Sequence, residues 1–272
     1  MDSLLQHPAV QGGVAPFVAG LIVAAVLGRA RLGGLAVVAG YALAVALVTG
    51  IAFTPLTAVR KVVLIALAAP VLGIAIDFVL RAGRTLETLV AAACGALTVW
   101  VFWSVLQQKE LGEAVLLGGV SALFVAWLVA VTMPLSGEPV RAGAAALVLG
   151  LATGISAILA ASALLGLYGI GLAAGAGGFL LWQMLTGRRI TAGATLTLSA
   201  SVAAGLFAAA ALFLAMLPWY ALIAFALIPL AARLPVPARF PIWAQAILLS
   251  VYCFAIAFVA FVLTWRAHPP PG

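Results

Sequence analysis

One acidic residue lies within an apolar stretch of the sequence that could cross a membrane, and it is the first candidate for chemistry. Asp77 stands four residues before Arg81, near the end of the stretch that starts after Lys61. Ionisable groups inside a membrane span are costly and commonly functional, so Asp77 could couple transport to a proton or another cation. The alternative is an interfacial carboxylate that pairs with Arg81 or Arg84. The depth of Asp77 in the membrane decides between these two interpretations.

Two consecutive basic residues, Arg60 and Lys61, form the second candidate. They follow Pro55 in the segment TPLTAVRK and begin the same apolar stretch. Such a pair could draw an anion or an acidic lipid headgroup to the outer mouth of a path through the protein. The simpler interpretation is that both long side chains extend to lipid phosphates while their methylene groups remain in the apolar region.

A row of hydroxyl side chains is the third candidate. Thr191, Thr195 and Ser199 recur at a spacing of four, which places them on one face of a helix. Ser156, in an earlier predicted span, could face this row, and together they could line a path for a polar solute. Hydrogen bonds between helices, or bonds from each hydroxyl back to its own helix, would explain the same pattern.

Signatures of catalysis and of metal binding are missing from the sequence. The two histidines, His7 and His268, are terminal, and the two cysteines, Cys94 and Cys253, lie singly in apolar stretches. There is no HExxH, GxSxG or phosphate-binding lysine motif, and no second carboxylate that could join Asp77 within a span. We therefore expect a protein that is not an enzyme and that needs no cofactor or metal.

The composition sets the class of protein that must position these residues. Of the 272 residues, 67% are hydrophobic and only 7% are charged, whereas soluble domains carry about 25% charged residues. The net charge of +7 comes from basic residues at the ends of apolar runs, so it predicts topology signals rather than a nucleic-acid partner. The sequence predicts an all-α, polytopic helical membrane protein.

The distance between flanking charges predicts about ten transmembrane helices, because one span needs about 20 residues. Two charge-free intervals are long enough for two spans each, and we expect them to turn at Leu165–Gly171 and at Met216–Trp219. The predicted spans are 13–29, 33–53, 62–80, 87–106, 113–133, 142–163, 168–186, 190–214, 217–232 and 241–265. The short connections leave no room for a soluble domain.

The basic residues also predict an orientation. Ten spans distribute the 13 basic residues so that nine lie in the connections on one side. Lysine and arginine are enriched in cytoplasmic connections, which predicts that the N-terminus lies outside. We expect a multi-pass protein of a bacterial inner (plasma) membrane. The Arg60–Lys61 pair is the exception to this charge bias.

Five spans fall on either side of about residue 136. An odd number per half would give residues 1–136 and 137–272 inverted topologies, as in many secondary transporters. Pairs of small residues at a spacing of four, Gly150–Gly154, Gly171–Gly175 and Ser162–Gly166, would allow helices to approach closely. These pairs predict either internal packing of one bundle or the contact face of a homodimer.

Two functions fit these features. The first is a small inner-membrane permease for a polar or amphipathic solute, working by alternating access with Asp77 as the coupling group. The second is a non-catalytic integral subunit or scaffold of a larger membrane complex, which the scarcity of polar residues within the spans also suits. The expected partners are membrane lipids, a small-molecule solute, and other membrane subunits or a second copy of the chain.

Overall fold

The structure, a computed structural model of the chain, describes residues 7–51, 54–80, 83–237 and 239–267. A five-residue π-helical turn (Val10–Val14) leads into the first α-helix, and a short 3₁₀ turn (Gly28–Ala30) follows it. The α-helices of these residues are α2 (Ala15–Leu27), α3 (Leu35–Val48), α4 (Ala58–Phe78), α5 (Arg84–Leu106), α6 (Leu111–Thr132), α7 (Pro139–Leu159), α8 (Ala163–Thr186), α9 (Gly193–Leu214), α10 (Trp219–Ala231) and α11 (Ile242–Ala267).

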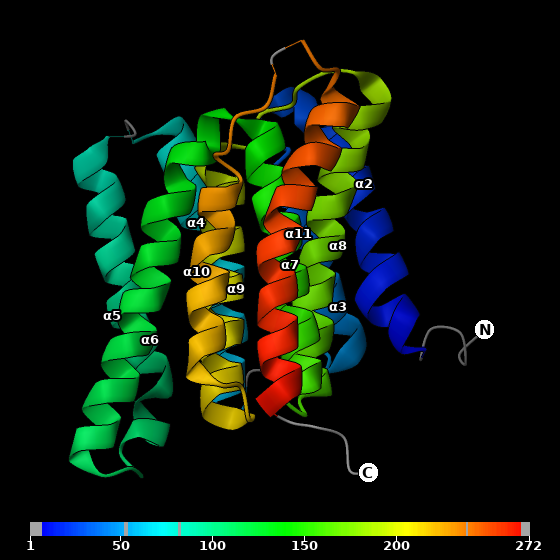
Figure 1. Cartoon of the computed structure of the whole chain (residues 1–272). Coiled ribbons are helices and arrows are strands. Elements are labelled where there is room, and N and C mark those ends of the chain that lie inside the picture. Colours follow the sequence, from blue (N-terminus) through cyan, green and yellow to red (C-terminus); the bar gives the residue numbers. More distant parts are fainter. Residues whose placement is uncertain (1–6, 52–53, 81–82, 238, 268–272) are drawn as a thin grey trace.

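These helices lie side by side as one up-and-down bundle (Figure 1). Eight helical segments of the described residues are long and apolar enough to cross a membrane, the first of them Val10–Ala30. The other two, α3 and α10, have 14 and 13 residues and are therefore only about 20 Å long. The protein is an all-α polytopic membrane protein, as the composition predicts.

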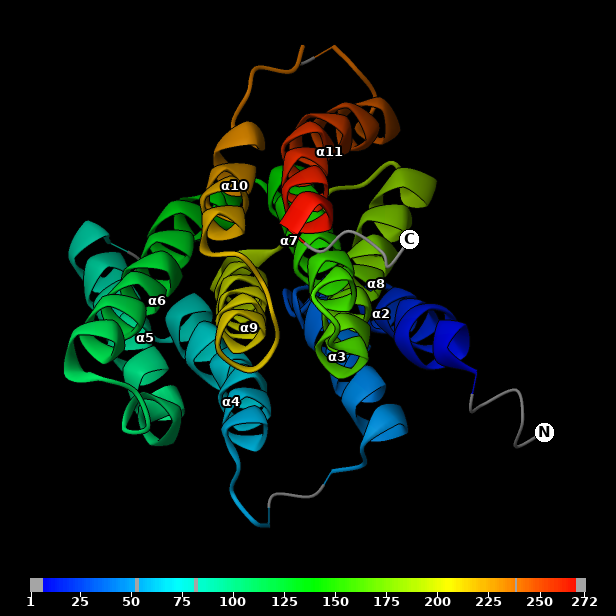
Figure 2. The same cartoon turned by 60° about the horizontal axis from the view of Figure 1, so that its bottom comes forward.

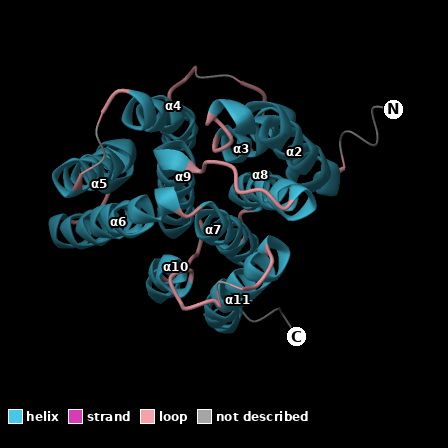
Figure 3. Ribbon diagram, turned by 90° about the horizontal axis from the view of Figure 1, so that it is seen from above, coloured by secondary structure: helices cyan, strands magenta, loops and turns pink. Residues whose placement is uncertain are grey.

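Helix α9 occupies the centre of the bundle. It contacts every helix from α3 to α8 (Figure 3), and each of its residues from Gly193 to Ala211 is buried. These residues are mostly alanine, serine, threonine, glycine and leucine, so neighbouring helices approach it from all sides. Small and hydroxyl-bearing residues favour contacts between helices over contact with lipid, and α9 fits that description.

Glycines of α7 and α8 form a second group of close contacts between helices. A Cβ atom added at Gly175 would lie 2.6 Å from the Ala36 carbonyl oxygen of α3, and one added at Gly150 would lie 2.6 Å from the Ala173 nitrogen of α8. Gly175 also lies against Gly20 of α2 and Gly40 of α3. The predicted pairs Gly150–Gly154 and Gly171–Gly175 thus serve packing within the chain, while a homodimer stays a prediction.

The turn predicted at Leu165–Gly171 is wrong. The chain turns earlier, at Ala160–Ser162, where Ala161 adopts a positive φ of 65°. The glycines that suggested a turn lie inside α8, where Gly166 and Gly169 pack against Gly154 of α7. Ser162 precedes α8 and does not lie on the helix contact predicted for it. In a membrane, a glycine cluster marks a close helix contact as readily as it marks a turn.

Successive helices run in opposite directions, so the connections between them alternate between two ends of the bundle. We name each end after one of its connections, the α3–α4 end and the α10–α11 end. The α3–α4 end also carries the α5–α6, α7–α8 and α9–α10 connections, and the α10–α11 end carries the others (Figure 1). At the α10–α11 end, Arg233 donates to the Val131 carbonyl of α6 at 2.6 Å, and Arg141 donates to the Ala232 carbonyl after α10 at 2.6 Å. Cations at carbonyl ends of helices are stabilising.

Helices of residues 1–136 do not gather on one side of the bundle. Helices α2 and α3 pack on α8, α4 packs on α9, and the α5–α6 pair lies at one edge (Figure 2). Each part of the first half thus packs on the second half, and the predicted inverted relation between the halves stays a prediction.

Candidate solute-binding site

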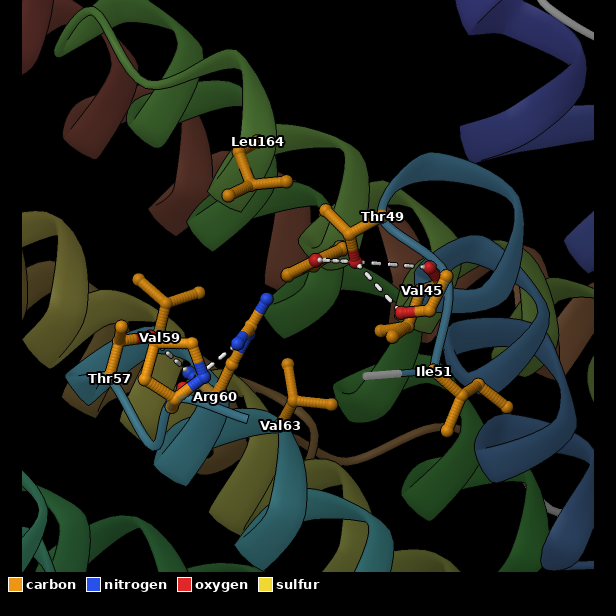
Figure 4. A pocket seen from close by; sticks show the side chains of 11 residues that line it. Val45, Thr49, Ile51, Thr57, Val59, Arg60, Val63 and Leu164 are labelled. Carbon is orange, nitrogen blue, oxygen red and sulfur yellow. Dashed lines mark hydrogen bonds between the residues drawn. The ribbon is translucent and has the colours of Figure 1, made fainter. Parts of the chain in front are cut away.

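A pocket of about 360 Å³ lies at the α3–α4 end, and we call it the Arg60 pocket (Figure 4). It extends from the last turn of α3 to the residues that follow this helix. Its walls come from α3, α4, the first turns of α8 and the segment before α4. The lining residues are Val45, Thr49, Gly50, Ile51, Pro55, Thr57, Val59, Arg60, Val63, Leu164 and Tyr168.

The local sequence positions Arg60 at this pocket. Thr57 caps α4 by accepting a hydrogen bond from the Arg60 backbone nitrogen at 3.4 Å, so the helix begins at Ala58. The Arg60 side chain then extends into the pocket, where its Nη1 donates to the Pro55 carbonyl at 2.9 Å (Figure 4). A guanidinium has five N–H donors, so most of its donors remain for a bound anion.

Two hydroxyl groups complete the polar part of the pocket. The Thr49 hydroxyl lies 2.7 Å from the hydroxyl of Tyr168, and it also lies 3.2 Å from the Val45 carbonyl (Figure 4). If Thr49 donates to Val45, then Tyr168 donates to Thr49, and both hydroxyl hydrogens are used while lone pairs on the oxygens stay available as acceptors. Apart from Arg60 and the cap residue Thr57, the other described residues that line the pocket have apolar side chains or none, and no lining residue is acidic.

The predicted basic pair separates in space. Lys61 does not line the Arg60 pocket; its ammonium lies 4.8 Å from the centre of the Trp100 ring on α5. Consecutive residues of a helix point about 100° apart, so the Lys61 side chain leaves the helix in another direction than that of Arg60. Lys61 instead makes a cation–π contact, which joins α4 to α5.

Asp77 lies at the opposite end of α4 and holds the first turn of α9. Its Oδ1 accepts from the Ala194 nitrogen at 2.6 Å, and its Oδ2 accepts from the nitrogen and the hydroxyl of Thr195 at 2.9 and 2.6 Å. Asp77 therefore acts as an N-cap provided by another helix. Arg81, one of its two expected partners, is outside the described residues, and no ion pair to the other, Arg84, is present within them.

The predicted row of hydroxyl side chains does not form one continuous face. Helix α9 begins at Gly193, so Thr191 lies before it and not on the predicted helix face. Ser199 donates to the Thr195 carbonyl of its own helix at 2.6 Å. Ser156 is fully buried, and its hydroxyl has no partner among the described residues. Thr195, Ser199 and Ser156 are all buried, and none of them lines the Arg60 pocket.

Sequence reasoning found Arg60 but missed Thr49 and Tyr168. Tyr168 lies in the segment that was expected to be a turn, and Thr49 lies inside the span predicted over 33–53. Thr49 directly follows α3 and Tyr168 lies on α8, and the two are 119 residues apart in the chain. No spacing in the sequence indicates that their hydroxyl groups meet.

Comparison of the chain with models of protein families, with curated proteins and with solved structures finds no match in any of the three. The residues of the pocket therefore carry the functional argument.

Proposed function

We propose that the protein is a small permease of a bacterial inner membrane, and that the Arg60 pocket is where it first binds an amphipathic anion. The observation that supports this proposal is a guanidinium in a mostly apolar pocket whose described lining residues include no carboxylate. Ligand pockets are commonly apolar with a few placed polar groups, and their volumes begin near 300 Å³. An apolar solute body would contact Val45, Val63 and Leu164.

The charge bias of the connections supports the orientation within this proposal. The α3–α4 end is the side with fewer basic residues, so the pocket would open to the outside and the N-terminus would lie there too. An arginine on that side, away from the main group of basic residues, would attract an anion at the entrance. Alternating access then takes the solute past α3, α4 and α8.

Arg60→Met tests the anion site. A charge-assisted hydrogen bond contributes about 1.5–3 kcal/mol, so the change should weaken the binding of butyrate or benzoate by about tenfold or more. Binding is measured as the ligand-induced rise in thermal unfolding temperature in detergent, and uptake is measured with labelled probe in proteoliposomes. Butylamine is the cation probe and should not bind.

Lys61→Met is the matched control, because Lys61 is the next residue and lies outside the pocket. It should leave butyrate and benzoate binding unchanged. Equal loss in both variants, or unchanged anion binding in Arg60→Met, would contradict the Arg60 site.

A second function, an integral subunit or scaffold of a larger membrane complex, is favoured by one observation. The buried hydroxyls of α9 bond within the chain, as expected for a structural core. Gentle detergent extraction separates the two functions: a scaffold elutes with other subunits at a fixed ratio, whereas a permease elutes alone and transports after reconstitution.

A further inference from the structure

A second polar pocket, of about 170 Å³, lies at the α10–α11 end, and we call it the Arg189 pocket. It is formed by the first turn of α7, the segment after α8 and the first turns of α11. Its lining residues are Glu138, Pro139, Val140, Arg141, Arg189, Val236, Gln245 and Leu249. Two of these are arginines and one is an acid, so the lining side chains have a net positive charge.

The two arginines are held in place by partners that leave donors free. Arg141 pairs through Nε with a Glu138 carboxylate oxygen at 2.6 Å, and its Nη1 donates to backbone carbonyls. Arg189 donates through Nη2 to the Gln245 side-chain oxygen at 3.1 Å. Gln245 is 91% buried and is fixed in turn by its bond to the Phe240 carbonyl at 2.7 Å. Glu138 neutralises Arg141, so Arg189 is the cation without an acidic partner among the lining residues.

An apolar groove runs along helices α8 and α11, next to the Arg189 pocket, and we call it the α8–α11 groove. It has a volume of about 430 Å³, and Ser250 is the only residue with a polar side chain among those that line it. The lining residues are Phe17, Leu147, Gly177, Leu180, Leu181, Met184, Ala246, Ile247, Ser250, Val251 and Phe254. Helix α11 thus borders the polar pocket with its first turns and the groove with the turns that follow.

The spacing of the pocket and the groove matches one kind of molecule. From Gln245 to Phe254, helix α11 rises about 14 Å, which is a short distance compared with an acyl chain and places the groove directly below the pocket in the membrane. A phospholipid has both parts that such an arrangement could bind: a phosphate for the polar pocket at the helix ends and a hydrocarbon chain for the groove along α8 and α11. Anionic headgroups are attracted to basic pockets of membrane proteins at this level.

We propose that the protein binds an anionic phospholipid, with its phosphate at Arg189 and one acyl chain in the α8–α11 groove. This site is at the opposite end from the Arg60 pocket and does not depend on the permease proposal. The lipid would fasten α11 to α8 by filling a groove that protein side chains leave open.

The test is lipid retention by the full chain. The purified protein is incubated with equal amounts of phosphatidylglycerol and phosphatidylcholine in detergent, and bound lipid is counted by native mass spectrometry. The intact protein should retain phosphatidylglycerol preferentially. Arg189→Gln should reduce this retention about tenfold, while Arg189→Lys should keep part of it. Arg188→Gln, a change at the neighbouring residue that does not line the pocket, should not reduce it.

Ser250→Phe tests the acyl chain by filling the groove, and it should reduce phosphatidylglycerol retention without moving the unfolding temperature of lipid-free protein. If Ser250→Phe has no effect and inorganic phosphate displaces the lipid fully, the pocket binds only a phosphate group and the lipid proposal fails. Equal retention of both lipids, or full retention by Arg189→Gln, also overturns it. Variants are compared only as monodisperse proteins, and Arg189→Lys guards against loss of folding at this position.

Discussion

The role that can be assigned to Asp77 depends on its neighbours in space. In the sequence it is the one acid within a span, and a coupling role stays a prediction for it. In the structure both of its carboxylate oxygens accept hydrogen bonds from the first turn of α9. Because Ala192, the residue before α9, provides no side-chain cap, Asp77 supplies the acceptors that this helix end lacks.

Asp77→Asn should lower the free energy of unfolding by about 1 kcal/mol, because an amide keeps only one of the two acceptor oxygens. Thermal unfolding in detergent measures this loss. Glu110→Gln is the control, since Glu110 precedes α6 without a side-chain cap bond, and its unfolding temperature should stay close to that of the unchanged protein.

The same variant separates the cap from coupling. If Asp77 only caps α9, uptake per folded molecule in Asp77→Asn should stay within about twofold of the original. If uptake driven by a proton gradient disappears while the unfolding temperature is unchanged, Asp77 couples transport and the capping account of this residue is insufficient.

At the scale of helices, close packing depends on residues without side chains. Gly175 of α8 lies against α2 and α3, where a Cβ atom would meet backbone that cannot move away. Gly119 of α6, in contrast, has no neighbouring atom within 4 Å of an added Cβ. The two glycines thus have opposite surroundings, close backbone at Gly175 and open space at Gly119.

Gly175→Ala should destabilise the protein by about 1–3 kcal/mol through overpacking. Gly119→Ala should be neutral or slightly stabilising, because alanine favours helix over glycine. Unfolding temperatures of the two purified variants measure the difference. Similar effects at both positions would contradict the helix contacts at Gly175.

Short helices also shape the candidate site. Helix α3 ends at Val48, and the Arg60 pocket is lined by Val45 in its last turn and by three residues that follow the helix, Thr49, Gly50 and Ile51. If α3 continued for two more turns, its side chains would occupy this space. The pocket is therefore a consequence of where one helix stops.

At the scale of the whole molecule, the alternation of helices separates the basic residues between two ends. Arginines at the α10–α11 end hold carbonyl ends of α6 and α10. The charge bias predicts that this end is cytoplasmic. The two proposed binding sites would then lie on opposite sides of the membrane.

Single cysteines test this orientation with a maleimide that does not cross membranes. Gln108→Cys, in the α5–α6 connection, should react in intact cells, whereas Arg188→Cys, after α8, should react only after permeabilisation. The native Cys94 and Cys253 are buried and give the background. The reverse labelling pattern would place the N-terminus inside and contradict the predicted orientation.

The sequence alone determined the class, the number of helices and most of their limits. Runs of about 20 apolar residues between charges suffice for this, because the cost of exposing backbone groups to lipid makes each such run a helix. Pro218 predicted the break at Met216–Trp219, because proline disfavours helix at the residue before it. Helix α10 begins at Trp219. Arg60 was identified as a candidate because its position opposed the charge bias.

The tertiary structure decided which helix is central, where the pockets lie and what each polar group does. Composition could not separate the glycines of a turn from those of a helix contact, which is why the turn before α8 was misplaced. Thr49 and Tyr168 meet 119 residues apart in the chain, and Asp77 meets the start of α9 across a similar separation. Local patterns report a residue's own helix, whereas hydrogen bonds and pockets depend on which helices pack together.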